Sequence, residues 1–431
     1  MKTFQYEECQ VIQTTQEGKE YFEYRIQLNR PDVERYFSMP SEEAARYNHW
    51  QEAGLTDFIR NQAEGSKIQE IQIENGTLIV TGIDGGVLYQ QVLEWIRDHY
   101  ADKEMHITRM FGSYILLQRL DGRLQAVKAT PIPIKYCPLM IQLLKEVGGK
   151  VAEELIDSLK DATEEVQSKL MCQLIDEVVI AGGYFDDQRP LNSCESNVLF
   201  GASEIMSSAF FSTLLDGAVI VSNNLGTIIT TSQTNTQGAV KRMTGLFYTS
   251  PSKRIMETAS TEDIVPIFPH TARIDQVEGV RKAISMGMQN IAVSVASKEN
   301  HLLEALSAME KEETTLYKFG LCTTGIDEET AKIMARHADI VWSCASKQVK
   351  DHIEPNAIAQ VGMKIPVHVM TQKGWYLVKN HLKKTYDSAG LGEVVPAKGA
   401  IKPILLNDNG TLKIIQKNEA EPCTDCPSPC I

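Results

Sequence analysis

Residues 291–296 read Ile-Ala-Val-Ser-Val-Ala and residues 317–321 read Tyr-Lys-Phe-Gly-Leu, and these two short apolar runs decide the expected fold. Similar runs at 217–221, 339–342 and 365–370 alternate with stretches of helical periodicity near 203–214, 276–286, 299–311, 328–338 and 349–361. Strands that alternate with helices in this way are typical of a mostly parallel sheet with helices on both faces. We therefore predict an α/β core domain over residues 131–403.

Two smaller units flank this core. Residues 1–130 contain strand patterns at 22–28 and 68–80, a helical pattern near 87–100, and hairpin turns at Asn75-Gly76 and Asp121-Gly122. They predict an N-terminal α+β domain. A helical layer is expected at 139–169, and residues 404–431 are expected to form one more hairpin followed by a cysteine-rich tail.

Composition narrows the class of protein. The chain has 431 residues and a formal charge of -13, from 43 Lys and Arg against 56 Asp and Glu. This charge repels phosphate backbones, so we expect no nucleic acid partner. The longest apolar runs fall well short of the roughly 20 residues that a membrane helix requires. The first residues carry no apolar signal core, and we therefore expect a cytoplasmic protein without a membrane partner.

Three cysteines stand close together in the tail. Cys423, Cys426 and Cys430 have the spacing C-x2-C-x3-C, and thiolates at this spacing bind iron-sulfur clusters or zinc. In a reducing cytoplasm, the nine cysteines of the chain are better explained as thiols or ligands than as disulfides. We expect a 4Fe-4S cluster, with zinc as the alternative and a fourth ligand from Cys137, Cys322 or Cys344, of which we predict Cys137 as the metal ligand. The competing interpretation is a flexible tail with incidental thiols.

Two other cysteines follow predicted strands. Cys322 comes after the run at 317–321 and Cys344 after the run at 339–342, so both are expected at the carboxyl edge of the sheet, where open α/β proteins bind ligands. Lys347 places a cation near Cys344 and is expected to lower its pKa. We predict Cys344, Cys322 and Lys347 as catalytic residues. Because free cysteine is also often buried, simple packing is the alternative for each thiol.

Polar loops near the predicted strand at 217–221 suggest a binding site for a cofactor or a small anionic substrate. A helix that begins after Phe200 and Gly201 offers amides to an anion, although capping of this helix by Ser203 explains the same pattern. The residues predicted to bind the cofactor are Ser203, Asn223, Gly226, Thr227, Gln237 and Arg242.

Several ordered motifs resemble one protein family over roughly residues 137–375. They include Cys137-Pro138-Leu139, the segments at 200–205, 226–230 and 242–246, Thr249-Ser250-Pro251, and the segments at 274–276, 323–326 and 344–347. This pattern resembles the family called methanogenesis marker protein eight. The resemblance implies a setting in anaerobic one-carbon, methyl-transfer or sulfur metabolism, with Cys137 and Cys344 as the residues carried over. The segment at 222–225 departs from it, because Ser-Asn-Asn-Leu replaces a cysteine-aspartate-glycine stretch.

Three functions fit these observations. The first is an iron-sulfur or thiol-dependent protein that works with a redox partner or a metalloenzyme client. The second is a metabolite-binding transferase or lyase without a cluster, in which Cys344 is the nucleophile and Lys241, Arg242 and Lys347 hold an anionic substrate. The third is a noncatalytic partner of a methyltransferase system.

Overall fold

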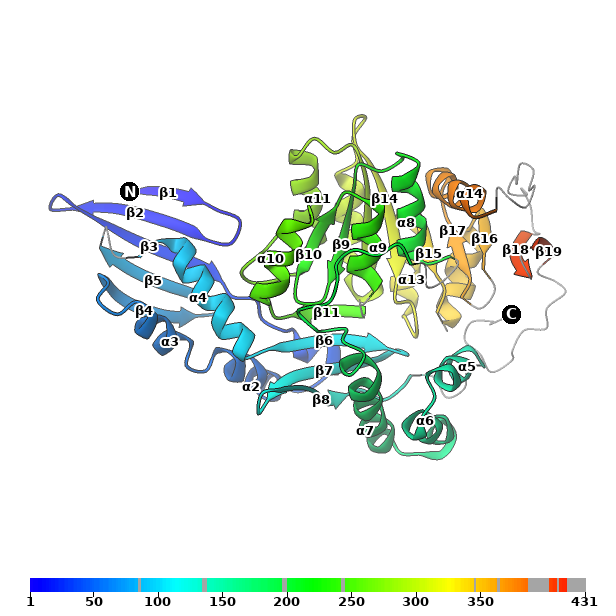
Figure 1. The fold of residues 1–431 in the computed structure, drawn as a ribbon, viewed down its shortest axis with the longest axis horizontal. Helices are drawn as coiled ribbons and strands as arrows, with labels where there is room; N and C mark the ends of the chain where they lie inside the picture. Colours follow the sequence, from blue (N-terminus) through cyan, green and yellow to red (C-terminus); the bar gives the residue numbers. More distant parts are fainter. Residues whose placement is uncertain are drawn as a thin grey trace.

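The protein is an α/β protein built on three sheets (Figure 1). The computed structural model describes residues 1–83, 87–133, 138–195, 200–241, 245–344, 346–362, 365–386, 403–408 and 411–416. The predicted domain boundaries near residues 130 and 403 stay predictions.

The largest sheet has ten strands in the order β12-β10-β9-β13-β14-β15-β17-β16-β18-β19. Its strands are β9 (Gly217–Ser222), β10 (Gly226–Thr230), β12 (Val265–Pro266), β13 (Asn290–Ala296), β14 (Thr315–Leu321), β15 (Ile340–Trp342), β16 (Ala359–Val361), β17 (Val367–Val369), β18 (Pro403–Asp408) and β19 (Thr411–Gln416). The four central strands β9, β13, β14 and β15 are parallel. Five of the nine described strand pairs of this sheet are antiparallel, so the sheet is mixed, and the prediction of a mostly parallel sheet is wrong in this respect.

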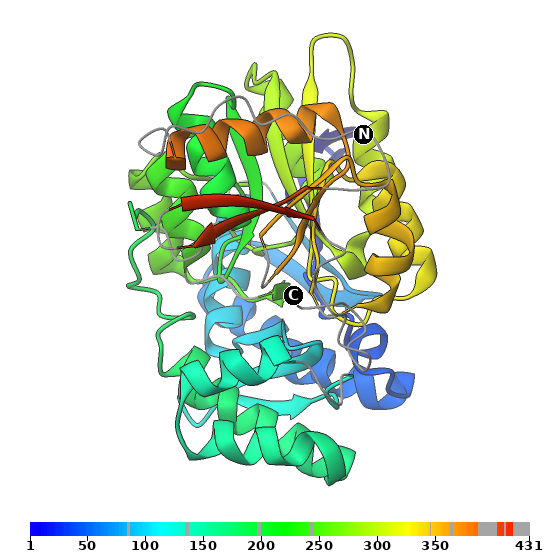
Figure 2. The same cartoon turned by 90° about the vertical axis from the view of Figure 1, so that its right-hand side faces the viewer.

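Helices cover both faces of this sheet (Figures 1 and 2). One face carries α8 (Ala202–Phe211), α9 (Gln233–Lys241), α10 (Lys253–Thr261) and α14 (Gln372–Tyr386), and the other carries α11 (Gln276–Ser285), α12 (His301–Ala308), α13 (Glu328–His337) and the π-helix η3 (Val349–Ile353). Within β13, Ala292 packs on the first face and Val293 on the second. Strands buried on both faces need apolar side chains at every position, which explains the continuous apolar runs of the sequence.

The helix expected near 349–361 is only partly present. It consists of η3, the short 3-10 helix η4 (Glu354–Asn356) and then β16, which belongs to the sheet. A run this short does not distinguish a helix from a buried strand by its periodicity.

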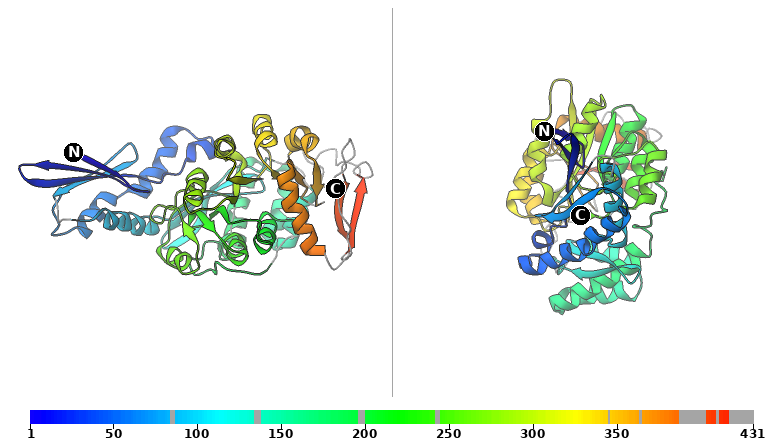
Figure 3. Two further views of the ribbon diagram at one scale, coloured as in Figure 1. Left: turned by 90° about the horizontal axis from the view of Figure 1, so that it is seen from above. Right: turned by 90° about the vertical axis from the view of Figure 1, so that its left-hand side faces the viewer.

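A five-stranded antiparallel sheet forms the N-terminal end of the molecule, opposite the β18–β19 hairpin (Figure 3). Its strands are β1 (Lys2–Gln5), β2 (Gln10–Gln16), β3 (Lys19–Gln27), β4 (Ile68–Glu74) and β5 (Thr77–Ile83). Two helices, α3 (Leu55–Gln62) and α4 (Tyr89–Asp102), pack on it. Asn75 and Gly76 join β4 to β5 with positive φ angles, which confirms the predicted hairpin.

The third sheet combines strands that follow the N-terminal sheet in sequence with one strand that follows β9 and β10 of the large sheet. Its order is β11 (Gly245–Thr249), β6 (Met105–Met110), β7 (Ser113–Leu120) and β8 (Arg123–Ala129), and all pairs are antiparallel. The helices α1 (Val33–Phe37) and α2 (Ser41–Glu52) contribute to the core on one face. The predicted helical layer, α5 (Pro138–Val147), α6 (Lys150–Asp161) and α7 (Glu164–Ile175), followed by the π-helix η1 (Asp176–Ile180), contributes to the core on the other. Strand β11 therefore carries the chain from the large sheet onto β6.

Candidate functional site

A cavity of about 330 Å³ lies at the carboxyl edge of the parallel strands. Val221 in β9, Ala296 in β13 and Leu321 in β14 line it, and so does Cys322 directly after β14. The rest of the wall comes from strand β11, the segment that follows β3, the start of α11 and the segment from the end of β13 to the start of α12. In open α/β sheets, this edge is where ligands bind, because the loops that follow several strands meet there.

Cys322 has an unusual backbone conformation at this edge. Its φ angle is +59°, in the left-handed region that costs a non-glycine residue about 1–2 kcal/mol. Two hydrogen bonds to its carbonyl oxygen hold the turn: Ser297 Oγ donates at 2.6 Å and Arg109 Nη1 donates at 2.7 Å. The thiol lies close to β11, because a Cβ atom built on Gly245 would come within 3.2 Å of Cys322 Sγ. Such strain is typical of positions with a functional constraint.

Cys344 follows β15 and lies near Cys322. Its amide donates to Thr323 Oγ1 at 2.8 Å, and the Thr323 hydroxyl in turn donates to the Trp342 carbonyl at 2.6 Å. Burial raises the pKa of the Cys344 thiol to about 11, with a further contribution from Cys322, against the opposing effects of Arg109 and two threonine hydrogen bonds. Burial also raises the pKa of Cys322, which Arg109 opposes. Both thiols are therefore protonated at neutral pH.

Lys347 does not have the expected effect on Cys344. Its side chain is mostly exposed and forms an ion pair with Asp351, one turn further along the chain. Burial dominates the pKa of Cys344, and the cation that acts on this thiol is Arg109, from strand β6. The sequence could not indicate this partner, because more than two hundred residues separate Arg109 from the two cysteines.

Arg109 is held by three backbone carbonyls. Its guanidinium donates to the carbonyl oxygens of Gly112, Cys322 and Thr324, and it lies 4.9 Å from the centroid of the Tyr114 ring. Among the described residues, no carboxylate forms an ion pair with it. Its positive charge is therefore not neutralised by an acid and stabilises a thiolate on Cys322.

The opposite wall of the cavity contains the start of α11. Asp275 caps this helix by accepting from the Glu278 amide at 3.0 Å, and the Asp275 amide donates to Thr227 Oγ1 at 2.8 Å. Gln276 is 2% exposed and donates through Nε2 to the Ser294 carbonyl at 3.3 Å. Its Oε1 has no hydrogen-bond partner in the described part of the protein. A buried acceptor without a donor is costly and is therefore a sign of a ligand position.

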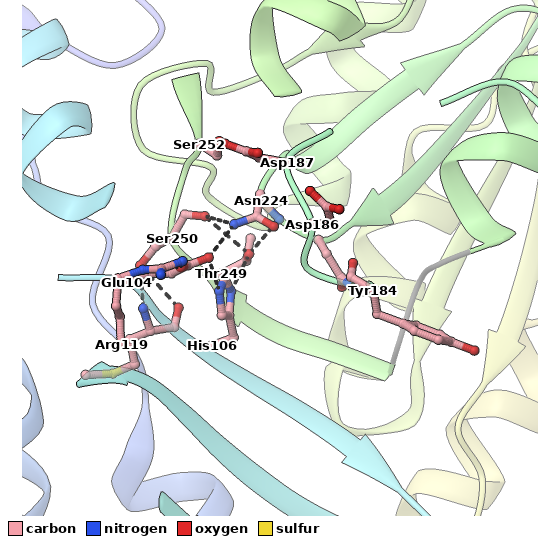
Figure 4. Close-up of polar contacts among 12 residues, drawn as sticks. Glu104, His106, Arg119, Tyr184, Asp186, Asp187, Asn224, Thr249, Ser250 and Ser252 are labelled. Carbon is pink, nitrogen blue, oxygen red and sulfur yellow. Dashed lines mark hydrogen bonds and ion pairs between the residues drawn. The ribbon is translucent and has the colours of Figure 1, made fainter. Parts of the chain in front are cut away.

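A buried polar network joins the start of β6 to β7, to the end of β11 and to the turn between β9 and β10 (Figure 4). Glu104 accepts hydrogen bonds from His106 Nε2 at 2.9 Å, from Arg119 Nε at 2.8 Å and from Asn224 Nδ2 at 2.9 Å. His106 Nδ1 lies 2.8 Å from Thr249 Oγ1. Burial lowers the pKa of His106, so the imidazole is neutral at neutral pH. Its Nε2–H donates to Glu104, and Nδ1 therefore accepts from the Thr249 hydroxyl.

The network reaches the cavity through Ser250 and Gln51. Gln51 Nε2 donates to Ser250 Oγ at 2.9 Å, and the Tyr248 hydroxyl donates to Gln51 Oε1 at 2.7 Å. Tyr248 lines the cavity. Burial raises the pKa of Glu104, but His106, Arg119 and Asn224 together lower it to about 2, while burial lowers the pKa of His106. The carboxylate is thus ionised at neutral pH, and hydrogen bonds through Asn224, Ser250 and Gln51 connect this buried charge to Tyr248 in the cavity wall.

The residues predicted to bind a cofactor lie in separate places. Ser203 and Gln237 both hydrogen bond to the buried Glu204, between α8 and α9. Gly201, and not Ser203, is the N-cap of α8. Asn223 lies in the turn between β9 and β10, where it donates to the Tyr184 carbonyl at 2.9 Å.

Gly226, with a φ of +66°, begins β10. Of the described residues predicted to bind a cofactor, Thr227 supports the cavity wall by accepting from the Asp275 amide, and of those predicted as catalytic, Cys322 lines the cavity. Arg242 lies outside the described residues, and so do the four predicted metal ligands Cys137, Cys423, Cys426 and Cys430.

Glu104, His106 and Gln276 were not identified from the sequence. Glu104 and His106 are two residues apart around the start of a strand, and this spacing puts both side chains on one face, which is the local signal that was available. Thr249, the partner of His106, belongs to one of the motifs on which the family resemblance rests.

The described part of the chain has neither a cluster of metal-binding side chains nor a membrane-spanning helix. No group of three or more His, Cys, Asp or Glu side chains there is arranged to hold a metal ion. No helix there combines the length and apolar character needed to cross a membrane. The predicted cluster ligands lie outside this part, so the metal hypothesis stays a prediction.

The fold and the site together define a mixed α/β protein with a thiol at a cavity on the carboxyl edge of its parallel strands. Residues 106–383 match the model of a family described as "Uncharacterized protein conserved in archaea (DUF2099)", and the chain belongs to this family. An uncharacterized protein of Methanocaldococcus jannaschii is 32% identical over 257 residues, which cover 59% of this chain and 82% of that relative. No solved structure matches the chain.

Proposed function

We propose that this protein is a thiol-dependent enzyme that acts on a small metabolite bound in the cavity, with Cys322 as the reacting group. The observation that carries the proposal is the position of Cys322, which lines a cavity of about 330 Å³ at the carboxyl edge of the parallel strands. A concave site with a few convergent polar groups at this edge is the usual location of an active site in such folds.

The neighbouring groups have roles that follow from their contacts. Arg109 opposes the effect of burial on the Cys322 thiol and stabilises the thiolate when the proton leaves. Ser297 and Arg109 fix the strained turn that directs this residue. Cys344 supplies a second thiol nearby, which takes part if the reaction passes through a disulfide. This proposal moves the nucleophile from Cys344, expected from the sequence, to Cys322.

The test uses a comparison of metabolite profiles. Wild-type protein, Cys322→Ser and the control Cys194→Ser are incubated without oxygen with a small-molecule extract of an archaeal cell. Cys194 is an exposed free cysteine and does not line the cavity. We expect a metabolite that wild type and Cys194→Ser consume and Cys322→Ser does not. Identical profiles for all three proteins, together with no covalent adduct on Cys322, would refute the proposal.

The metabolic setting is a second part of the proposal. It rests on the resemblance to methanogenesis marker protein eight, which favours a reaction in anaerobic one-carbon, methyl-transfer or sulfur metabolism in the cytoplasm. The relative in Methanocaldococcus jannaschii fits an archaeal setting.

An iron-sulfur cluster on the tail, supplied with electrons by a redox partner or serving a metalloenzyme client, is the second candidate. The spacing of Cys423, Cys426 and Cys430 favours it. Iron and acid-labile sulfide are measured on anaerobically purified wild type and on Cys426→Ser. Both elements should be present in wild type and lost in the variant, and zinc in their place would make the tail structural.

A further inference from the structure

We infer that the cavity binds an ammonium group of its ligand, held by the carboxylate of Glu299 and the carboxamide oxygen of Gln276. This inference rests on the proposed function only in placing the ligand in the cavity that Cys322 lines. It names the chemical class of the substrate, which is a small metabolite with a protonated amine at one end.

The first argument is the unpaired acceptor on Gln276. The Ser294 carbonyl accepts from the Gln276 amide nitrogen at 3.3 Å, and this contact fixes the orientation of the carboxamide, because the flipped form would place two oxygens against each other. Oε1 therefore stays on the other side, with no donor in the described part of the protein. A ligand N–H group supplies the missing donor.

The second argument is that the side-chain donors of Asn29, Arg30, Tyr36 and Tyr248 in the cavity wall already have partners. Asn29 Nδ2 donates to two backbone carbonyls. The Tyr36 hydroxyl donates to Glu299, and the Tyr248 hydroxyl lies within hydrogen-bond distance of Gln51 Oε1 and of the Asn29 carbonyl. Arg30 makes two hydrogen bonds to Glu52, at 2.5 and 2.7 Å. An anionic ligand would have to break these contacts, whereas a donating ligand leaves them in place.

The third argument is charge. Three carboxylates, those of Asp32, Asp275 and Glu299, line the cavity against one guanidinium, that of Arg30, which is paired with Glu52. His301 also lines it, with a mostly exposed ring whose Nε2 lies 3.9 Å from Glu299 Oε2. Arg35 lies 3.1 Å from Glu299 Oε1, and the nearest contact between Arg273 and the Asp275 carboxylate is 3.7 Å. A carboxylate has about four acceptor positions, so each acid keeps capacity for a ligand.

Aromatic rings complete the site. Tyr36, Phe247 and Tyr248 line the same cavity, and the centroids of the Tyr36 and Phe247 rings are 5.0 Å apart. Ring faces attract cations and add to the effect of a nearby carboxylate. Glu299 also accepts from the Tyr36 hydroxyl at 2.6 Å, which orients the carboxylate beside these rings.

The test measures the electrostatic potential of the cavity by comparing how fast two thiol reagents of opposite charge react with Cys322. The 2-aminoethyl and 2-sulfonatoethyl methanethiosulfonates transfer groups of similar size. In each reaction the Cys322 thiolate attacks the sulfenyl sulfur, a disulfide forms, methanesulfinate leaves, and the thiol proton goes to solvent. Rate constants at Cys322 are measured by peptide mass mapping at pH 8. The ratio of cationic to anionic rates at the exposed Cys194 provides the reference within the same chain.

We divide the ratio of cationic to anionic rate constants at Cys322 by the same ratio at Cys194, and we expect this normalised ratio to be about five or more at low salt. Because salt screens the interaction between charges, the normalised ratio should fall at 0.5 M salt. Arg109 opposes this preference at the thiol itself, so a cationic preference reports the charge further inside the cavity. Glu299→Gln should reduce the ratio by at least about twofold. Glu313→Gln makes the same change of charge before β14, at the opposite edge of the sheet, and should leave the ratio unchanged.

The outcomes separate the two proposals. A ratio at or below one, at a Cys322 that reacts readily, would overturn the ammonium site and leave the thiol enzyme standing. A Cys322 that reacts with neither reagent while Cys194 reacts with both would overturn both proposals, because the thiol would then not open to the cavity. If Glu299→Gln fails to fold, the loss of the wild-type preference at high salt supports the inference, and a salt-independent ratio refutes it.

Discussion

The replacement Glu104→Gln tests the buried network behind the cavity. Glu104 is 5% exposed, and its carboxylate accepts from His106, Arg119 and Asn224. The glutamine amide has the same shape but no charge, and its nitrogen faces groups that are themselves donors. One donor therefore loses its acceptor inside the protein, and Arg119 loses its ionic partner.

The magnitude follows from the pKa of the carboxyl group. Its decrease from the usual 4.5 to about 2 makes the ionised form about 3 kcal/mol more favourable in the folded than in the unfolded protein, at about 1.4 kcal/mol per pKa unit. Because the pKa is depressed on folding, this stability is fully present above pH 4.5 and is lost as the pH falls toward 2. At pH 3.5 about 2 kcal/mol remains. Glu104→Gln should therefore cost about 3 kcal/mol at pH 7 and less in acid.

The assay is urea unfolding followed by circular dichroism, at pH 7 and at pH 3.5, on wild type and Glu104→Gln. The control is Glu43→Gln, which removes an exposed ion pair with Lys128 and should not change the midpoint measurably. Arg119→Met and the double variant complete a cycle that isolates the pair. A loss below about 1 kcal/mol at pH 7, or the same loss at both pH values, would refute the reasoning.

Three further predictions concern other parts of the molecule. Because burial raises the pKa of Cys344 to about 11, its alkylation by iodoacetamide should accelerate about tenfold per pH unit from pH 8 to 10, and a plateau near pH 8.5 would contradict this. Asp339→Asn removes a 1% exposed carboxylate that lies 3.8 Å from Lys318 Nζ and 3.4 Å from Lys373 Nζ, but both lysines keep Glu310 as an ionic partner and burial already raises the pKa of Asp339, so urea unfolding should show a loss of only about 1–2 kcal/mol; a loss of about 3 kcal/mol or more would contradict this. Gly226→Ala places a Cβ 2.2 Å from a backbone carbonyl and should lower the melting temperature far more than Gly287→Ala, which has positive φ but open space; equal losses would show that φ strain alone is responsible.

Local features of the fold could be predicted because they depend on neighbours in the chain. The hairpin turn at Asn75-Gly76 needs only two residues that tolerate positive φ, and the structure has it. The strands β13 and β14 were predicted from continuous apolar runs, and both are buried on two faces. The capping of α13 by Asp327, which accepts from the Thr330 amide at 2.7 Å, is local as well.

Strand direction in the outer part of the large sheet could not be predicted in this way. Residues 222–227 were interpreted as a polar binding loop, but they form the tight turn and first residues of a hairpin in which Ser222 pairs with Gly226. Asn224 has a φ of +63° in this turn. Polar residues are common both in binding loops and in tight hairpin turns, so the composition of the segment does not distinguish the two. The pairing of β10 with β9 shows that it is a hairpin turn.

The candidate site, too, could be predicted only in its local features. From the sequence alone, Cys322 and Cys344 could be placed at the ends of neighbouring strands, because parallel strands present their carboxyl ends at one edge. The tertiary structure decided which thiol lines the cavity, which cation acts on it, and that burial outweighs the charge of Lys347. It also brought Glu104 to Asn224, 120 residues further along the chain. Periodicity and turn chemistry act over a few residues and are therefore present in the sequence, whereas burial and the pKa of a thiol depend on segments that meet only when the whole chain has folded.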